Sequence, residues 1–331
     1  MIPFTFTQAH SEREALDRVH QPNTVFIAGG TTLIDLMKLN VETPASLVDI
    51  NSLPLDKIEV QPDGSLRVGA MVRNSDLAHH PKVQQNFPVL AQALLSGASP
   101  QLRNMATTGG NLMQRTRCYY FRDTEYVCNK REPGSGCAAL EGFNRIHAVL
   151  GGSDQCIATH PSDMAVALVA LEAVVHISGP KGERKVPIGE FHLLPGNTPH
   201  IETVLQPGEL ITHVTVPASA FAARSAYVKL RDRASYEFAL ASAAAALELQ
   251  GNQIRAARLA LGGVATKPWR SPEAERVLTG AAAEEKTFQA AAEAAMKGAV
   301  PHKHNAYKIE LAKRAIVRAL TQAAQKPESH S

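Results

Sequence analysis

All four cysteines of this 331-residue chain lie in one stretch of the sequence, and this clustering constrains the fold more than any other feature. The spacing is C-x9-C-x8-C-x18-C, with the thiols at Cys118, Cys128, Cys137 and Cys156. Core cysteines pack as small hydrophobic residues and would be scattered along the chain. A confined set of four thiols instead predicts a segment that folds around a four-thiolate metal centre.

Three kinds of site would use four clustered thiols. In an iron–sulfur cubane, each cysteine supplies one thiolate to one iron. In a structural zinc site, the sulfurs complete a closed tetrahedron. Zinc segments usually carry C-x2-C pairs, which this chain lacks, but so do many iron–sulfur segments. Disulfides would staple the segment, although large secreted domains rarely confine every bridge to one loop. The spacing alone therefore leaves iron–sulfur and zinc as equal alternatives.

Residues 115–160 hold the cysteines and show no sustained hydrophobic period. A long stretch of this kind in a compact protein is usually a functional loop. Positive charge near thiolates lowers their pKa, so basic neighbours favour a metal centre, with solvated surface or partner contacts as the alternative. His147 and His160 lie near Cys156 and are alternative ligands. The basic residues of this region are Arg103, Arg115, Arg117, Arg122, Lys130, Arg131 and Arg145.

Two Gly-Gly turns precede the cysteines. The first lies in residues 27–33 (IAGGTTL), between an apolar strand and a helix, and the second in residues 107–111 (TTGGN). Glycines allow positive φ and close approach, and free backbone N–H groups at a helix start attract anions. Neither run is a G-x-G-x-x-G fingerprint or a P-loop, and one Gly-Gly pair alone is typical of a tight turn. Together the two turns predict a clamp on the diphosphate of a nucleotide.

Hydrophobic periodicity predicts a mixed α and β chain. Residues 162–175 are expected to form a capped helix that runs into a strand, whereas residues 238–249 fit either a strand or a helix. The other expected strands and hairpins cover residues 24–28, 46–50, 58–70, 174–188, 210–216, 226–231 and 254–263. The other expected helices cover residues 11–19, 31–39, 74–95 (with breaks at Pro81 and Pro88), 272–278, 284–296 and 306–324.

Size and charge exclude several classes of protein. A chain of 331 residues predicts two or three domains, and we place the main boundary near residues 217–222. The net charge of +3 argues against nucleic acid and against an anionic membrane surface as partners. No apolar run approaches the roughly 20 residues of a membrane helix. The first residues lack the basic and apolar regions of a signal peptide, so we expect no export signal in this chain.

Several runs of the chain resemble one known family. Residues 26–38 and 103–112, which contain the two Gly-Gly turns, are similar to the FAD-binding subunits of molybdenum hydroxylases, the group of xanthine dehydrogenase and carbon monoxide dehydrogenase. Residues 161–165 and 206–211 match further family segments, and residues 257–265 resemble the family's small C-terminal domain. The resemblance covers essentially the whole chain.

The resemblance implies an α+β fold of two domains. Residues 1–219 would form a PCMH-type FAD-binding domain of two α/β subdomains, with the cysteine loop at residues 115–160. Residues 220–331 would form a C-terminal α+β domain of the CO dehydrogenase flavoprotein type.

Most members of the family lack the cysteine loop. Subunits that possess it occur in periplasmic aldehyde oxidoreductases and in 4-hydroxybenzoyl-CoA reductase, where four cysteines hold a [4Fe-4S] cluster. Residues 114–118, 128–131 and 133–139 are most similar to the aldehyde oxidoreductase subunit. The resemblance therefore implies a cubane instead of zinc, with Cys118, Cys128, Cys137 and Cys156 as its ligands.

The resemblance also implies which residues contact FAD. The two turns would hold the diphosphate, and the flavin ring would lie near Ile211 and Lys229. Asp163 would be a carboxylate on the phosphate side, with a helix N-cap as the equally favoured alternative. The implied contacts are Phe26, Ile27, Ala28, Gly29, Gly30, Thr31, Thr32, Leu33, Thr107, Thr108, Gly110, Asn111, Asp163, Ile211 and Lys229.

The implied function is electron transfer, and no catalytic acid or base is assigned to this chain. A molybdenum-cofactor subunit would oxidise an aldehyde, and a [2Fe-2S] subunit would pass electrons to the FAD and then to an external acceptor. The assembly would be a heterotrimer or a dimer of heterotrimers. Periplasmic location by co-export with a partner is implied, with the cytoplasm as the alternative. Competing functions are the FAD subunit of a hydroxybenzoyl-CoA reductase or xanthine dehydrogenase, an autonomous FAD oxidoreductase, and a zinc-stapled assembly protein without flavin.

Overall fold

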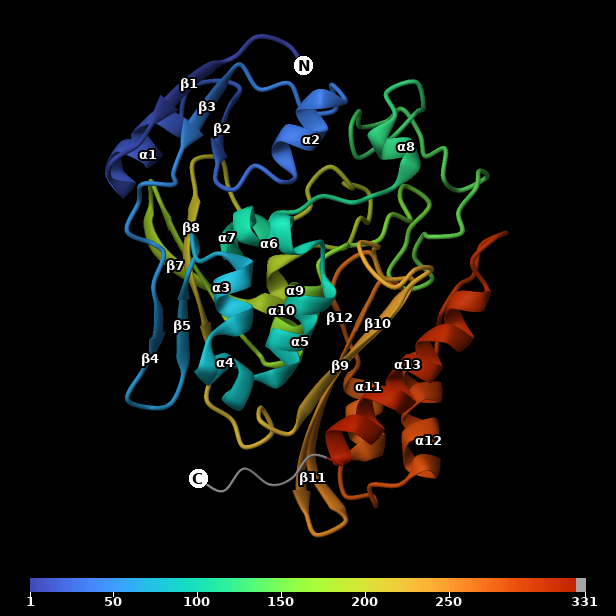
Figure 1. The fold of residues 1–331 in the computed structure, drawn as a ribbon. Coiled ribbons are helices and arrows are strands. Elements are labelled where there is room, and N and C mark those ends of the chain that lie inside the picture. The colour runs from blue at the N-terminus through green and yellow to red at the C-terminus, as the bar shows by residue number, and fades with distance from the viewer. Residues whose placement is uncertain (326–331) are drawn as a thin grey trace.

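The computed structural model describes residues 1–325 and contains three sheets (Figure 1). A small parallel sheet has the order β1-β3-β2, and a larger antiparallel sheet has the order β4-β5-β8-β6-β7. The third sheet is antiparallel with the order β12-β11-β10-β9. The strands are β1 (Thr5–Gln8), β2 (Thr24–Ile27), β3 (Ser46–Asp49), β4 (Ile58–Val60), β5 (Leu66–Gly69), β6 (Val174–Gly179), β7 (Gly182–Pro187), β8 (Leu210–Val216), β9 (Ser225–Leu230), β10 (Ala241–Gln250), β11 (Gln253–Gly262) and β12 (Trp269–Arg270).

Helices separate the sheets into layers. Most helices of the first two hundred residues lie between the five-stranded and the four-stranded sheets, and α11–α13 cover the other face of the four-stranded sheet (Figure 1). The helices are α1 (Glu12–Val19), α2 (Leu33–Lys38), α3 (Asn74–His79), α4 (Pro81–Asn86), α5 (Pro88–Ser96), α6 (Pro100–Met105), α7 (Thr108–Leu112), α8 (Tyr119–Arg122), α9 (Asp163–Ala170), α10 (Ile188–Phe191), α11 (Pro272–Leu278), α12 (Glu285–Ala295) and α13 (Tyr307–Ala324). None of these described helices is both long and apolar enough to cross a membrane.

The two strands and the helix predicted at residues 24–50 form a β-α-β unit, which places the first Gly-Gly turn at the edge of a sheet. β2 and β3 run parallel, and β1 pairs in parallel with the other side of β3. The chain leaves β2 at Ile27 and enters α2 at Leu33, so the turn lies at the carboxyl end of a parallel strand. This is the usual position of ligand-binding loops in such sheets.

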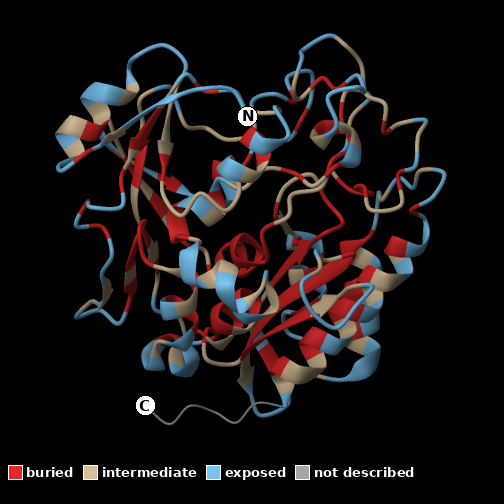
Figure 2. Ribbon diagram, turned by 45° about the horizontal axis from the view of Figure 1, so that its top comes forward, coloured by how far each residue is buried: buried red, intermediate tan, exposed pale blue. Residues whose placement is uncertain are grey.

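Helix α9 in the middle layer is apolar on all of its faces because it is buried on all sides. Every residue of α9 is buried, which explains why this helix shows an apolar run without a polar face (Figure 2). Its N-cap is Ser162, whose hydroxyl accepts a hydrogen bond from the N–H of Ala165. Asp163 is the first helical residue, so its alternative interpretation as an N-cap is wrong.

The four-stranded sheet resolves the ambiguity at residues 238–249, because β10 is a strand. Its alanines alternate between two cores: Ala244 faces the core shared with α5 and α9, and Ala243 and Ala245 face the core shared with α13. Helices pack against both faces of this sheet, so small side chains let them approach. Tertiary packing therefore overrides the high helix propensity of alanine.

Two segments differ from the sequence expectations. The second Gly-Gly turn is not a loop, because it forms the first turn of α7. A further helix, α6, immediately precedes it. The cysteine segment lacks long elements as expected, and α8 is the one helix among its described residues. The expected C-terminal domain, residues 220–331, extends six residues beyond the described part of the chain.

Candidate functional site

A cleft runs around the two Gly-Gly turns. One pocket of about 350 Å³ lies against the three-stranded sheet, and a second of about 230 Å³ lies against α5, α6 and α9. The two pockets share Thr31, Thr32 and Gly110 and so form neighbouring parts of one site. The predicted contacts that line it are Phe26, Ile27, Ala28, Gly29, Gly30, Thr31, Thr32, Leu33, Thr107, Gly110, Asn111, Asp163 and Ile211.

The first turn needs both of its glycines. A Cβ on Gly29 would lie 1.9 Å from the carbonyl oxygen of Met105, so the first turn packs against the backbone at the end of α6, just before the second turn. Gly30 has φ +69°, a left-handed conformation that favours glycine. Within residues 1–325, the backbone N–H groups of Gly30, Thr31 and Thr32 donate no hydrogen bond. These free donors give the cleft its capacity to bind an anion.

The second turn uses its N–H groups internally. The N–H groups of Thr108 and Gly109 donate to the carbonyls of Val72 and Ala70, at 2.9 and 2.8 Å. Thr107 caps α7, and its hydroxyl accepts from the N–H of Gly110 at 3.2 Å. The Thr108 hydroxyl donates to the carbonyl of Val72, so this predicted contact points away from the cleft. The second turn therefore forms a fixed wall of the cleft.

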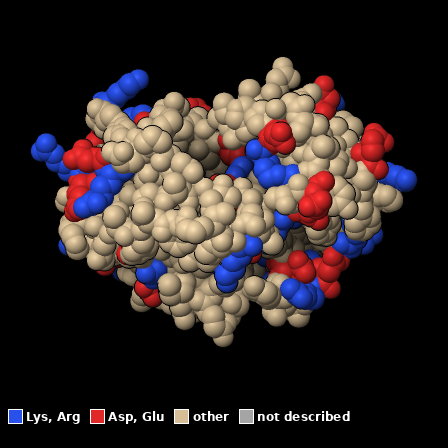
Figure 3. Space-filling model, turned by 90° about the horizontal axis from the view of Figure 1, so that it is seen from above, with Lys and Arg blue, Asp and Glu red and all other residues tan. Residues whose placement is uncertain are grey.

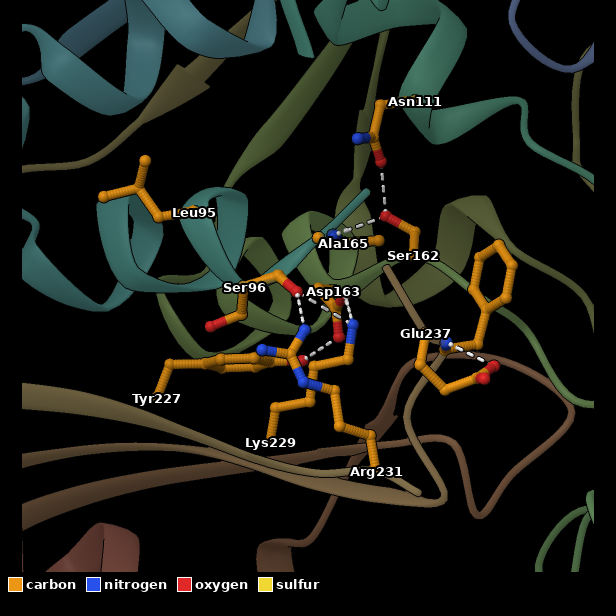
Figure 4. Close-up of polar contacts among 12 residues, drawn as sticks. Leu95, Ser96, Asn111, Ser162, Asp163, Ala165, Tyr227, Lys229, Arg231 and Glu237 are labelled. Atoms are coloured by element: carbon orange, nitrogen blue, oxygen red, sulfur yellow. Dashed lines mark hydrogen bonds and ion pairs between the residues drawn. The ribbon is translucent and has the colours of Figure 1, made fainter. Parts of the chain in front are cut away.

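Asp163 and Lys229, both predicted FAD contacts, bond to each other beneath the cleft (Figure 4). The Lys229 ammonium lies 2.7 Å from one carboxylate oxygen of Asp163, and the Tyr227 hydroxyl donates to the other at 2.6 Å. Lys229 also donates to the carbonyl of Ser96. Burial, reinforced by the Asp163 charge, holds the pKa of Tyr227 well above its usual value. Lys229 thus acts through Asp163 and does not itself line the two pockets.

Sequence reasoning missed three polar residues that shape the cleft. The Asn51 amide donates to the carbonyl of Ala28 at 3.0 Å and accepts from Arg73 at 3.1 Å. Arg73 also donates to the carbonyl of Met105, which braces the first turn against the second. Asn74 lines the inner pocket, and its buried Oδ1 has no hydrogen-bond partner within residues 1–325. Isolated Asn and Arg residues carry no sequence motif, so only their position identifies them.

The four cysteines meet in one small pocket between α8 and residues 127–158. All four are free thiols, and three are buried. Cys128 and Cys137 pair across an isolated β-bridge, and all four belong to one hydrophobic cluster. Within residues 1–325, no group of three or more His, Cys, Asp or Glu side chains is arranged to hold a metal ion. The structure therefore gathers the thiols without forming a compact single-ion site.

The electrostatics of this pocket differ from the expectation. Burial raises the pKa of Cys118 to about 12 and that of Cys156 to about 11, so removal from water outweighs the positive charges nearby. Backbone N–H groups compensate in part, because they donate to the sulfurs and favour the thiolate. The N–H of Ala158 donates to the sulfur of Cys156 at 3.4 Å. The pKa values are also lowered by the N–H groups of Tyr120 and Phe121 near Cys118, and of Ala139, Leu140 and Ile157 near Cys137.

Most of the basic residues around the cysteines are paired instead of facing the sulfurs. The pairs are Arg115 with Glu42 and Glu202, Arg117 and Arg122 with Asp35, and Arg145 with Asp232. Arg131 donates to the carbonyls of Tyr120 and Phe121, at 2.9 and 2.8 Å, which fixes the loop. These arginines therefore bond within the chain and stabilise the segment, which differs both from a role toward the thiols and from the alternative of solvated surface or partner contacts. Lys130 is the exception among the basic residues, because its charge favours the Cys156 thiolate and lowers the pKa of that thiol.

The two histidines near the cysteines have different environments. His147 is buried, and its Nε2 lies 3.1 Å from the sulfur of Cys118. His160 packs edge-on against His192, with ring centroids 4.3 Å apart, and its Nδ1 accepts from the N–H of Ser162. Of these two histidines, His147 is the one that lies within hydrogen-bond distance of a cysteine sulfur.

The surface above these sites carries no dominant charge. Seen from the side of the three-stranded sheet and the cysteine segment, basic and acidic groups lie intermingled and broad areas are uncharged (Figure 3). This distribution matches the small net charge of +3. It provides no continuous basic tract for a nucleic acid on this face.

Known proteins share the features of this chain over nearly its full length. It is 53% identical over 325 residues to the aldehyde oxidoreductase FAD-binding subunit PaoB of Escherichia coli (strain K12), covering 98% of this chain and 99% of that one. A carbon monoxide dehydrogenase structure from Hydrogenophaga pseudoflava, which lacks the Mo-pyranopterin moiety, matches with TM-score 0.76 and 30% identity, covering 98% of each chain. Quinoline 2-oxidoreductase from Pseudomonas putida 86 matches with TM-score 0.76 and 27% identity, also covering 98% of each.

Two family models divide the chain between them. Residues 2–219 match the FAD binding domain in molybdopterin dehydrogenase. Residues 225–323 match the CO dehydrogenase flavoprotein C-terminal domain. The first model alone covers more than half of the chain, and the second covers the four-stranded sheet and α11–α13. With its cleft between two glycine turns, this chain belongs to the FAD-binding subunits of the molybdopterin dehydrogenase family, as the resemblance implied.

Proposed function

We propose that this chain is the FAD- and [4Fe-4S]-binding electron-transfer subunit of a molybdenum-dependent aldehyde oxidoreductase. The observation that carries the proposal is the presence of a two-turn cleft and a four-thiol pocket in one chain. The likeness to an aldehyde oxidoreductase subunit, at 53% identity over nearly the whole length, supports the substrate class.

The cleft fits a dinucleotide such as FAD. Free N–H groups at Gly30, Thr31 and Thr32 would receive the diphosphate, and the unpartnered Asn74 Oδ1 would accept a donor of the ligand. The second turn would close the other side, and Asp163, held by Lys229, would face the ligand from below. Ile211 and the apolar residues of 26–33 would pack against its rings. Bound FAD supplies storage of an electron pair.

The four-thiol pocket fits an iron–sulfur cluster. A cubane takes one thiolate at each iron, so its four sulfurs surround a volume instead of a point. Backbone N–H groups directed at the sulfurs of Cys118, Cys137 and Cys156 suit thiolate ligands. Cys128 lines the same pocket and completes the set of four. We assign these cysteines, and not His147 or His160, as the ligands.

The rest of the assembly follows from the family. We infer that a [2Fe-2S] subunit delivers electrons from a molybdenum-cofactor subunit to this chain, which passes them to an external acceptor. A heterotrimer, or a dimer of heterotrimers, would hold the three subunits together. We place the domain boundary between residues 219 and 220, and we place the complex in the periplasm after co-export with a partner.

Visible spectroscopy of the anaerobically purified full-length chain, with its partners, tests the proposal. We expect flavin bands, a broad iron–sulfur absorption and, for each FAD, four irons in addition to those of the [2Fe-2S] subunit, as one cubane requires. Cys118→Ser and Cys137→Ser should lose this iron, because each removes one ligand, and should keep part of the flavin.

Tyr126→Phe is the matched control, since Tyr126 lies in the same loop but does not line the thiol pocket. It should keep both cofactors. A colourless protein that contains zinc would refute the proposal. Reduction of the flavin by a small substrate in the isolated chain would show an autonomous oxidoreductase instead of an electron-transfer subunit.

A further inference from the structure

Lys308 is a fully buried cation at the start of α13. It is 0% exposed, and it forms no ion pair among the described residues. Its ammonium donates to three backbone carbonyls, those of Ile146, His147 and Gly263. An ammonium has three N–H donors, so these carbonyls satisfy all of them. Burial lowers the pKa of Lys308 to about 7, with a smaller contribution from Arg145.

The neighbours of Lys308 hold the same part of the cysteine segment. The Asn305 amide donates to the carbonyls of His147 and Ala148, at 3.3 and 3.2 Å. The N–H of His304 donates to the Asn144 side chain at 2.9 Å. Residues 144–148 are therefore clamped by the beginning of α13, which belongs to the C-terminal region, residues 225–323. Two buried side chains converge on one carbonyl, that of His147.

His147 connects these contacts to the cysteines, because its carbonyl accepts from Lys308 and its side chain contacts Cys118. Its imidazole is 1% exposed and places Nε2 at 3.1 Å from the sulfur of Cys118. An imidazole with a single N–H carries it on Nδ1 or on Nε2, and its position is inferred from the contacts of both atoms.

The contacts place that hydrogen on Nε2 when Cys118 is a thiolate. Nδ1 is buried and has no partner within residues 1–325. A hydrogen on Nδ1 would bury an unpaired donor and would turn the Nε2 lone pair toward an anionic sulfur. A hydrogen on Nε2 instead donates to the thiolate.

We propose that the C-terminal region positions His147, through Lys308, as a hydrogen-bond donor that stabilises the thiolate of Cys118 and tunes the four-cysteine centre. This inference rests on the proposed iron–sulfur function. An N–H donor to a ligand sulfur stabilises the more negative, reduced form of a cluster. His147 and Lys308 are thus positioning residues, and neither is a ligand.

Three substitutions in the full-length complex test the inference. His147→Leu removes the donor, His147→Gln keeps an N–H group near the sulfur, and Lys308→Met removes the clamp. We expect His147→Leu to lower the reduction potential of the cluster. A redox titration with EPR detection measures this potential. We also expect iron release to a chelator to become about tenfold faster, the typical effect of losing such a supporting contact. His147→Gln should restore much of both properties, and Lys308→Met should resemble His147→Leu.

Lys313→Met is the matched control on the same helix. Lys313 pairs with Glu293 and Glu310 and makes no contact with the cysteine segment, so both readouts should stay at the wild-type values. If Lys308→Met does not fold, the comparison of His147→Leu with His147→Gln still tests whether His147 acts as a hydrogen-bond donor. Equal behaviour of folded His147→Leu and His147→Gln, or a wild-type potential in His147→Leu, would overturn the inference. Absence of the four additional irons of the cubane from the wild-type complex would instead overturn the proposed function.

Discussion

The two Gly-Gly turns have similar compositions, but they use their backbone N–H groups in opposite ways. In the first turn, the N–H groups of Gly30, Thr31 and Thr32 donate to nothing within residues 1–325. In the second, the N–H groups of all four residues from Thr108 to Asn111 find acceptors in the protein. One turn is therefore open to a ligand, and the other is a rigid wall.

The difference arises from what surrounds each turn. The second turn lies beside β5, whose end supplies the carbonyls of Ala70 and Val72, and Thr107 adds a capping hydroxyl. The first turn lies at the end of a small sheet, where no carbonyl of residues 1–325 accepts a hydrogen bond from the N–H groups of Gly30 and Thr31. A Gly-Gly pair thus predicts close backbone approach, but the segments of the chain that pack around the pair decide whether its N–H groups stay free.

Gly29→Ala should have the largest effect. Its Cβ would lie 1.9 Å from a backbone oxygen of Met105, which cannot rotate away as a side chain can, so the two turns must separate. We expect the free energy of unfolding to fall by about 1–3 kcal/mol. Flavin occupancy should fall about tenfold or more, which corresponds to about 1.4 kcal/mol of binding. Thermal unfolding and flavin absorbance per chain measure the two effects.

Gly189→Ala is the control for Gly29→Ala, because a Cβ at Gly189 would contact nothing within 4 Å. It should leave both measurements unchanged. Full flavin content in Gly29→Ala would show that the close approach of the two turns is not required for binding.

Gly110→Ala should have an intermediate effect. Its Cβ would lie 2.9 Å from the hydroxyl of Thr107, a side-chain atom that can move. The movement would break the cap of α7, so we expect a loss of about 1 kcal/mol in stability. Flavin content should fall less than in Gly29→Ala. A complete loss of flavin would mean that the second turn contacts the ligand as closely as the first.

Thr107→Ala should have the smallest effect. It removes the capping hydroxyl without adding a group, so we expect a loss of about 1 kcal/mol or less in chemical denaturation. Flavin content should stay near the wild-type level, because the N–H groups proposed to bind the diphosphate belong to the first turn. Thr107→Ser keeps a hydroxyl and should be more stable than Thr107→Ala. Loss of flavin in Thr107→Ala but not in Thr107→Ser would make this hydroxyl a ligand contact.

Much of the fold could be predicted from local patterns. Prolines at positions 81 and 88 start new helices where the sequence indicated breaks, and residues 58–70 form a hairpin as expected. The ambiguous run at residues 238–249 could not be assigned, because alanine favours a helix and the strand depends on helices covering both faces of its sheet. Helix α6 was missed, since its six residues are too short to show a period.

The candidate sites divide in the same way. The sequence places four thiols and two glycine turns where chemistry is expected, and the structure brings each set together. The sequence did not reveal that Lys229 bonds to Asp163 or that most arginines of the cysteine segment are paired. It also did not reveal that Lys308 donates hydrogen bonds to the carbonyls of residues 146 and 147. Those partners lie 66 to 162 positions apart along the chain.

Residue patterns alone identify the family of this protein, the positions of its glycine turns and the confinement of its thiols to one segment. The folded arrangement is needed to see which N–H groups remain free, how burial changes the thiol pKa values, and which side chains bond to Asp163 or contact Cys118. The physical reason is that local patterns record backbone preferences, whereas hydrogen bonding and desolvation depend on segments that meet only after folding.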